Sequence, residues 1–311
     1  NTIGSNNNFI GKCAGKCNTT GCFNNFIGMY AGIKNTTGCC NNMIGRGAGQ
    51  CATVTGLHNT FLGTYAGKCA TGTGCYNNFF GNCAGQNNTT GSNNNSFGTK
   101  AGLYNTTGTN NNFIGNRAGL GNTTGNNNNF IGLYAGKCNT GGVGGVFLGS
   151  YAGCFNTTGN LNVFIGCAAG KCNTTGSRNV FIGDGAGNKN TTGSYNTMIG
   201  ECAGACSNVT GCSNNFIGRC AGKCASDTGR DNNFFGVNTG YCNTTGSYNN
   251  FIGCSAGQSN TTGSTNIYVG LLAGSCGTEA SRNVFIGQYA GIGNTTGCCN
   301  NMIGRGAGQC A

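Results

Sequence analysis

One short repeat accounts for almost the whole chain of 311 residues, and its consensus is N-T-T-G-S-x-N-N-F-I-G-x-x-A-G-x-x. Eighteen copies follow one another without a break: fourteen have 17 residues and four have 18, the longer ones beginning at Ala52, Ala70, Ser207 and Ala225. A unit this short cannot bury a core of its own, so it has to be stabilised by stacking on its neighbours. The period therefore indicates a repeat architecture.

Glycine is constant at positions 11 and 15 of the repeat, and at position 4 in all copies but the one that has Ala280. Glycine at fixed offsets marks turns that need a positive φ, or contacts that leave no room for a side chain. No window has a helical period, and Gly and Asn are poor helix formers. The sequence predicts an all-β fold, a parallel β-solenoid (β-helix or β-roll) of 18 rungs of 17–18 residues, as one uninterrupted array over residues 1–311.

A second, much longer repeat relates the two ends of the chain. Residues 290–311 match residues 31–52 except that Gly293 stands where the earlier copy has Lys34. We expect the array to be a segment of a longer fibrous chain that continues after Ala311 as it does after Ala52. A recent duplication is the alternative explanation.

Positions 7, 9 and 10 of the repeat lead to predictions about how its side chains pack. Position 7 is Asn in every copy except at Gly145, and stacked Asn side chains can form an amide ladder. Position 9 is Phe in 13 copies and position 10 is always apolar, mostly Ile. Neighbours on a strand point to opposite faces, so one of these two columns fills the core and the other faces outward. An outward Phe stripe would have to be covered by another chain or a second sheet; a kinked strand with both columns inside is the alternative.

The 24 cysteines fall mostly at positions 5, 13 and 17. Some flank one turn (Cys17 with Cys22, Cys69 with Cys75, Cys206 with Cys212), and others share a column on adjacent rungs (Cys51 with Cys69, Cys202 with Cys220, Cys224 with Cys242), while Cys138 and Cys154 are almost in column. Stacked rungs bring Cα atoms to about 5 Å, which is within the disulfide range. These pairings compete, so the connectivity stays open.

Metal binding is the rival interpretation of the cysteines. Cys13 and Cys17, Cys202 and Cys206, and Cys220 and Cys224 have C-x-x-x-C spacing. A zinc site needs four converging thiolate or imidazole ligands, whereas the chain has one His and no compact C-x-x-C pair. We therefore expect disulfides, an oxidising extracellular or cell- or virion-surface location, and no metal or other cofactor.

N-glycosylation sequons in the sequence agree with an extracellular or cell- or virion-surface location. The motif N-x-T recurs at position 1 of the repeat, with one shifted copy at Asn208-Val209-Thr210. Because this corner comes back in every rung, we expect it to be exposed and to carry covalent glycans; a turn in which Asn and Thr cap backbone groups is the alternative. The candidate glycosylation sites are Asn18, Asn35, Asn88, Asn105, Asn122, Asn156, Asn173, Asn190, Asn208, Asn243, Asn260 and Asn294.

The charged residues argue against several functions. The 16 Lys and Arg exceed the 5 Asp and Glu, but they form a thin stripe and not the dense basic clusters typical of nucleic-acid binding. We expect them to keep the rods soluble or, as the alternative, to contact acidic polysaccharide. No run of about 18 apolar residues is present, so no membrane span is expected. One histidine and five scattered acids offer little to catalysis, so we expect no enzyme: His58, Asp184, Glu201, Asp227, Asp231 and Glu279.

The run F-I-G-x-x-A-G-x-x-N-T-T-G resembles the Gly-rich repeats of trimeric autotransporter adhesin heads and of fibre proteins from phages and large viruses. The resemblance spans all 18 copies and implies a β-roll or fibrous stalk on a cell or virion surface. The chain differs from these families in its 17-residue unit, its many cysteines and its lack of a heptad stalk.

These features together predict a structural protein that forms an extracellular, disulfide-stapled, glycosylated fibril from copies of itself, joined end to end or laterally. An adhesin or receptor-binding surface fibre is the alternative.

Overall fold

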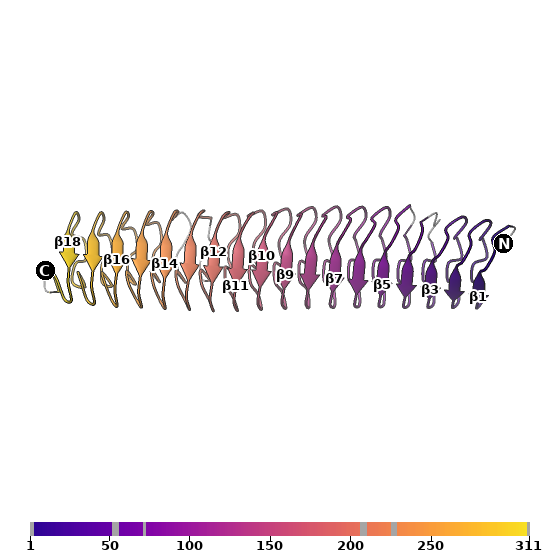
Figure 1. Ribbon diagram of the computed structural model, residues 1–311, viewed down its shortest axis with the longest axis horizontal. Helices are drawn as coiled ribbons and strands as arrows, with labels where there is room; N and C mark the ends of the chain where they lie inside the picture. Colours follow the sequence, from indigo (N-terminus) through magenta and orange to yellow (C-terminus); the bar gives the residue numbers. More distant parts are fainter. Residues whose placement is uncertain (1–2, 52–55, 71–72, 206–209, 225–228, 310–311) are drawn as a thin grey trace. The chain divides into compact units, whose positions relative to one another are not determined.

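The computed structural model describes residues 3–51, 56–70, 73–205, 210–224 and 229–309. The chain forms two compact units, Asn1–Thr158 and Gly159–Ala311. Each unit is a stack of rungs, and each rung contributes one strand of three residues (Figure 1). The strands of the first unit are β1 (Asn8–Ile10), β2 (Asn25–Ile27), β3 (Asn42–Ile44), β4 (Thr60–Leu62), β5 (Asn78–Phe80), β6 (Asn95–Phe97), β7 (Asn112–Ile114), β8 (Asn129–Ile131) and β9 (Val146–Leu148). Those of the second unit are β10 (Val163–Ile165), β11 (Val180–Ile182), β12 (Thr197–Ile199), β13 (Asn215–Ile217), β14 (Asn233–Phe235), β15 (Asn250–Ile252), β16 (Ile267–Val269), β17 (Val284–Ile286) and β18 (Asn301–Ile303).

Consecutive strands within a unit pair in parallel and in register. Phe113 of β7 lies beside Phe130 of β8, and Phe234 of β14 lies beside Phe251 of β15. Each position of the repeat therefore stacks on itself from rung to rung. The predicted parallel β-solenoid is confirmed, and the described residues contain no helix.

Four residues of each rung have left-handed backbone conformations, at positions 6, 11, 13 and 15. In the second rung these are Phe23, Gly28, Tyr30 and Gly32, with φ of 56°, 131°, 63° and 54°. At positions 6 and 13 ordinary residues accept this conformation at a cost of roughly 1–2 kcal/mol each. At positions 11 and 15 they cannot: a Cβ on Gly28 would lie 2.6 Å from the carbonyl oxygen of Gly45, and a Cβ on Gly32 would lie 2.6 Å from the ring of Phe26. Both expected reasons for these glycines therefore apply: a positive φ and a contact that leaves no room for a side chain.

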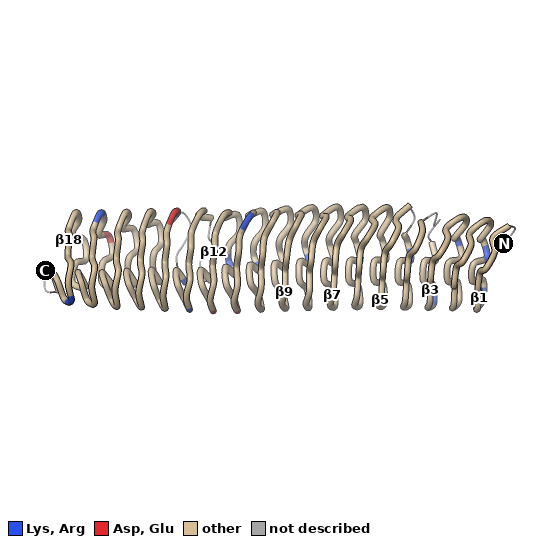
Figure 2. The backbone as a smooth tube through the Cα atoms, in the orientation of Figure 1, with Lys and Arg blue, Asp and Glu red and all other residues tan. Residues whose placement is uncertain are grey.

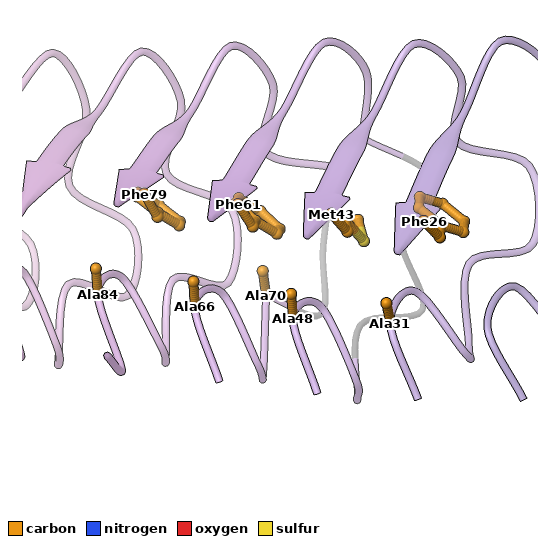
Figure 3. Close-up of a cluster of buried hydrophobic side chains, with 9 residues drawn as sticks. All are labelled: Phe26, Ala31, Met43, Ala48, Phe61, Ala66, Ala70, Phe79 and Ala84. Carbon is orange, nitrogen blue, oxygen red and sulfur yellow. The ribbon is translucent and has the colours of Figure 1, made fainter. Parts of the chain in front are cut away.

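The core of each unit is a column of aromatic rings packed against a column of alanines. Phe26, Phe61 and Phe79 point inward toward the Ala side chains on the opposite wall of the rung (Figure 3). The rings stack along the axis: the centroids of Phe61 and Phe79 are 5.0 Å apart and their planes differ by 5°. Alanine suits the facing column because its side chain leaves the interior to the ring.

The structure confirms that positions 9 and 10 face opposite sides of the strand and shows which of the two lies inside. Phe130 at position 9 is fully buried, whereas Ile131 at position 10 is 38% exposed. The kinked strand with both columns inside is therefore wrong, and so is the outward Phe stripe, because the outward column is position 10, which is mostly Ile. The side chains at position 9 face the alanine column across the interior.

Two rungs of the first unit lack the aromatic side chain, because Met43 and Ser96 occupy position 9, and only the small Ser96 leaves space there. Phe113 of the next rung leans away from the stack, so that its plane makes 32° with that of Phe130, against 7° between Phe130 and Phe147. The tilted ring fills part of the space that Ser96 leaves.

Candidate functional site

The Asn residues of the predicted glycosylation sites are not exposed. In every described rung this side chain lies in the interior, as at Asn35, Asn122 and Asn190, each with no exposed surface. The Asn35 Nδ2 donates to the Gly38 carbonyl oxygen at 3.1 Å and to the Asn18 Oδ1 at 2.7 Å. The expectation that this corner is exposed is therefore wrong, whereas glycosylation itself stays a prediction. A glycan would replace one of the two Nδ2 hydrogens and would need space beside a buried side chain. The buried residues are Asn18, Asn35, Asn88, Asn105, Asn122, Asn156, Asn173, Asn190, Asn243, Asn260 and Asn294, while Asn208 lies outside the described residues.

These asparagines form a side-chain ladder that the sequence analysis missed. The Asn122 Nδ2 donates to the Asn105 Oδ1 at 2.7 Å, and the Asn139 Nδ2 donates to the Asn122 Oδ1 at 2.6 Å. Asn139 carries the signal that could have revealed it, because Asn139-Thr140-Gly141 keeps the Asn where the sequon is lost. An Asn that is needed for a buried amide ladder is kept there even without the sequon. An Asn needed only to carry a glycan would not have to be kept.

The ladder is interrupted where a copy of the repeat begins with another residue. The Oδ1 atoms of Asn35, Asn190 and Asn260 are buried without a hydrogen-bond partner in the described part of the chain. The copies that follow these three begin with Ala52, Ser207 and Gly277 in place of Asn. Each orphaned acceptor thus marks the end of one run of the ladder.

The amide ladder predicted at position 7 is confirmed. The Asn24 backbone N–H donates to the Asn7 Oδ1 at 2.9 Å, and the Asn24 Nδ2 donates to the Gly38 carbonyl oxygen at 2.8 Å. The same arrangement recurs at Asn111, whose N–H donates to the Asn94 Oδ1 at 3.0 Å. One Asn per rung therefore ties its own rung to both neighbours.

Cysteines of adjacent rungs meet along the columns. The Cys22 N–H donates to the Cys39 Sγ at 3.1 Å, and the Ser5 N–H holds the pKa of the Cys22 thiol below its usual value. Burial, and after it the thiol of Cys51, raises the pKa of Cys69. Cys69 thus interacts with the column neighbour Cys51.

Two other predicted cysteine pairs also lie on adjacent rungs, one in the same column and one beside it. Burial raises the pKa of Cys202, and the Cys220 thiol of the next rung adds to the effect. The Cys138 N–H donates to the Cys154 carbonyl oxygen at 2.9 Å, which places this pair side by side but one position out of column. No disulfide is present between the described cysteines, which include Cys17, Cys212, Cys224 and Cys242 among the candidates; Cys206 lies outside them.

The residues considered for metal binding or catalysis do not gather. Among the described residues no three His, Cys, Asp or Glu side chains come together as metal ligands. His58 belongs to the first unit and stacks on Tyr76 with 5.1 Å between ring centroids, whereas all five acids belong to the second unit. Asp227 lies outside the described residues. Neither unit brings a histidine and a carboxylate together.

The outward face of the strands is the most uniform surface of the protein. We call it the outer strand face; it consists of positions 8 and 10 of each rung. Position 8 is Asn, Thr, Val or Ile and position 10 is Ile, Leu, Phe or Val, so none of the eighteen described strands places a charge on it. Phe80 and Phe97 stack on this face with centroids 4.8 Å apart. It is a flat, uncharged and half-apolar surface.

Helices of the length and apolarity that a membrane crossing requires do not occur in the described ranges. No protein-family model matches the chain, and no curated protein matches its sequence.

Proposed function

We propose that the protein is a structural rod whose units pack side by side with those of other copies to build an extracellular fibril. The outer strand face carries the proposal, because it presents an uncharged apolar column on every rung although the chain has a net charge of +11. Contiguous exposed apolar surface on a soluble protein usually marks an interface. The location outside the cell rests on the many cysteines, whose column pairs would lock neighbouring rungs once oxidised.

The exposed area is large enough for lateral packing. Position-10 side chains such as Ile114 and Ile286 are 41% and 39% exposed. At roughly 70 Å² per rung, nine rungs offer about 600 Å², close to the ~800 Å² per partner of a stable interface. Burying this surface would contribute about 25 cal/mol per Å² before the cost of association is subtracted.

The regular spacing favours a second copy as the partner. Side chains on the outer strand face recur at every rung, about 4.8 Å apart. Only a surface with the same spacing can match it at each rung, and another copy of this chain provides one. Lateral self-association therefore explains both the apolar column and the absence of charge beside it.

Adding charge to the outer strand face tests the proposal. We expect the full chain to sediment as assemblies and to form fibrils in negative-stain electron micrographs. A variant with lysine at four separated position-10 residues should remain monomeric while keeping the circular-dichroism spectrum of the parent. The four substitutions are Leu62→Lys, Ile114→Lys, Ile252→Lys and Ile286→Lys.

A matched control adds the same charge elsewhere. Four exposed position-3 threonines become lysine: Thr90→Lys, Thr124→Lys, Thr192→Lys and Thr245→Lys. We expect this control to assemble like the parent. Equal loss of assembly in both variants would mean that net charge, and not the outer strand face, governs association.

A further inference from the structure

The two units differ sharply in charge. The first unit contains eight Lys and Arg and no Asp or Glu, and so carries +8; the second contains eight and five, and so carries +3. Acidic residues accordingly occur only in the second unit (Figure 2). No cation of the first unit can be neutralised by a carboxylate of the same unit.

The cations of the first unit all lie on one stretch of the rung, positions 12 to 17, which follows the strand. We call this set the basic arc: Lys12, Lys16, Lys34, Arg46, Lys68, Lys100, Arg117 and Lys137. In the second unit only five cations lie at these positions, where Asp184 and Glu201 lie as well, and Arg178, Arg230 and Arg282 lie at position 5 or 6, before the strand. The first unit therefore concentrates its charge on one side of the strand.

Backbone hydrogen bonds hold the basic arc in register. The Tyr65 N–H donates to the Arg46 carbonyl oxygen at 2.9 Å, and the Arg117 N–H donates to the Thr99 carbonyl oxygen at 2.9 Å. Such bonds fix successive rungs at about 4.8 Å, so eight charges are distributed over roughly 40 Å. The result is a row of cations: the first rung has two, six further rungs have one each, and the rungs that begin at Ala70 and Asn139 have none.

Two tyrosines organise the cations further. The Tyr65 ring has the Arg46 Cζ at 5.8 Å and the Lys68 Nζ at 4.7 Å from its centroid. The Tyr134 ring has the Arg117 Cζ at 5.4 Å and the Lys137 Nζ at 5.3 Å. Cation–π contacts of this kind limit the freedom of the long side chains, which lowers the entropy lost when they bind a ligand.

We propose that the basic arc binds a linear anionic polysaccharide that lies along the rungs. Cations spaced one or two rungs apart suit a polymer with carboxylate or sulfate groups spaced along its sugars, and Arg recognises both groups through paired hydrogen bonds. Duplex nucleic acid carries a charge every ~1.7 Å, far denser than this line. Single strands rely on open aromatic faces for base stacking, whereas Tyr134 already stacks on Tyr151 at 5.2 Å.

The proposal goes beyond lateral packing and does not depend on it. The basic arc follows the strand along the chain and shares no residue with the outer strand face, so a fibril could bind polysaccharide and pack at the same time. Such binding would also give the adhesive-fibre alternative a physical basis.

The test measures the Kd of the full chain for dextran sulfate, neutral dextran and oligo-dT at physiological ionic strength. The arc variant removes the four cations that contact the two tyrosines: Arg46→Gln, Lys68→Gln, Arg117→Gln and Lys137→Gln. The control variant removes two Arg and two Lys from the same positions of the second unit, where the cations are fewer and Asp184 and Glu201 lie among them: Lys171→Gln, Arg219→Gln, Lys223→Gln and Arg305→Gln. Both lower the net charge by the same amount.

We expect dextran sulfate to bind and neutral dextran not to bind. The arc variant should raise the Kd for dextran sulfate by about tenfold or more, whereas the control variant should change this Kd by less than about threefold. Equal effects of the two variants would reduce the interaction to net charge and overturn the proposal. Absence of dextran sulfate binding, or tighter binding of oligo-dT, would overturn it as well. Sedimentation of the arc variant should still show assembly, which separates this result from the test of the outer strand face.

Discussion

The two units of the protein have the same rung but different outer surfaces. In the first unit seven of nine strands begin with Asn, and the Asn78, Asn95 and Asn112 side chains form a third amide ladder with Nδ2 to Oδ1 distances of 2.9 and 2.7 Å. The second unit has one short run of this ladder, in which Asn215 donates to Asn233 and Asn233 to Asn250. In the second unit four of nine strands begin with Val or Ile, and all five acids of the chain lie there. The inner positions, by contrast, are nearly identical in both. The rung is therefore specified by its buried columns, and the outer columns are free to differ.

If the buried columns alone specify the rung, removing a core ring should lower the free energy of unfolding by the same amount in either unit. We expect Phe130→Ala in the first unit and Phe251→Ala in the second each to lower the free energy of unfolding by about 3–5 kcal/mol, because both rings are fully buried in a stack. Urea unfolding followed by circular dichroism measures the loss. Ile131→Ala, on the outer strand face, is the control and should cost much less. A large difference between the two Phe variants would show that the units are not equivalent inside.

Oxidation allows the aligned cysteine pairs of the two units to be compared with each other. We expect mild oxidation to join Cys51 to Cys69 in the first unit and Cys202 to Cys220 in the second, each closing a loop of 18 residues and stabilising the fold by about 3 kcal/mol. The raised pKa of Cys69 and Cys202 should make both reactions slow at neutral pH, because little thiolate is present. Peptide mapping without reduction identifies the bonds. Turn-flanking links such as Cys69 to Cys75 would contradict the column arrangement.

The position-1 ladder can be broken in one unit and repaired in the other. Asn139→Gly should lower the free energy of unfolding by about 1–3 kcal/mol, because it removes the donor to the buried Asn122 Oδ1 and one acceptor of the Asn156 Nδ2. Gly277→Asn should raise it by about 1 kcal/mol, because it supplies a donor to the orphaned Oδ1 of Asn260. Thermal unfolding of each variant against the parent measures both changes. Opposite signs are the essential result; destabilisation by both would mean that the chain needs glycine at 277, where a Cβ would lie 3.1 Å from the Asn294 carbonyl oxygen.

The smallest effect concerns the one tyrosine in the aromatic column, which belongs to the second unit. Burial raises the pKa of Tyr268 to about 12, because the folded interior disfavours the phenolate. The unfolded chain releases this proton near pH 10, so the contribution to stability is complete below pH 10 and is lost as the pH rises from 10 to 12. Tyr268→Phe should remove this part of the pH dependence. The difference between parent and variant, followed by unfolding at several pH values, cancels the titration of the cysteines; an unchanged profile would contradict the burial of the phenol.

Much of the fold follows from the repeat, because each column stacks on itself. The parallel register, the glycines at positions 11 and 15 and the Asn ladder at position 7 could all be predicted from residues that hardly vary among the copies. The candidate sites were harder to predict. N-T-T can be an exposed sequon or a buried ladder with capping threonines, and only Asn139, which has lost the sequon, favoured the ladder.

The sequence by itself determined the period, the parallel stacking and the chemistry of each column, because a 17-residue unit with fixed glycines has no other way to bury its apolar residues. Only the tertiary structure decided which columns lie inside. Alternation along a strand separates positions 9 and 10 without saying which of them faces the core. That choice depends on how the left-handed residues at positions 6, 11, 13 and 15 close the rung, and on which side chain then spans the space to the alanine column.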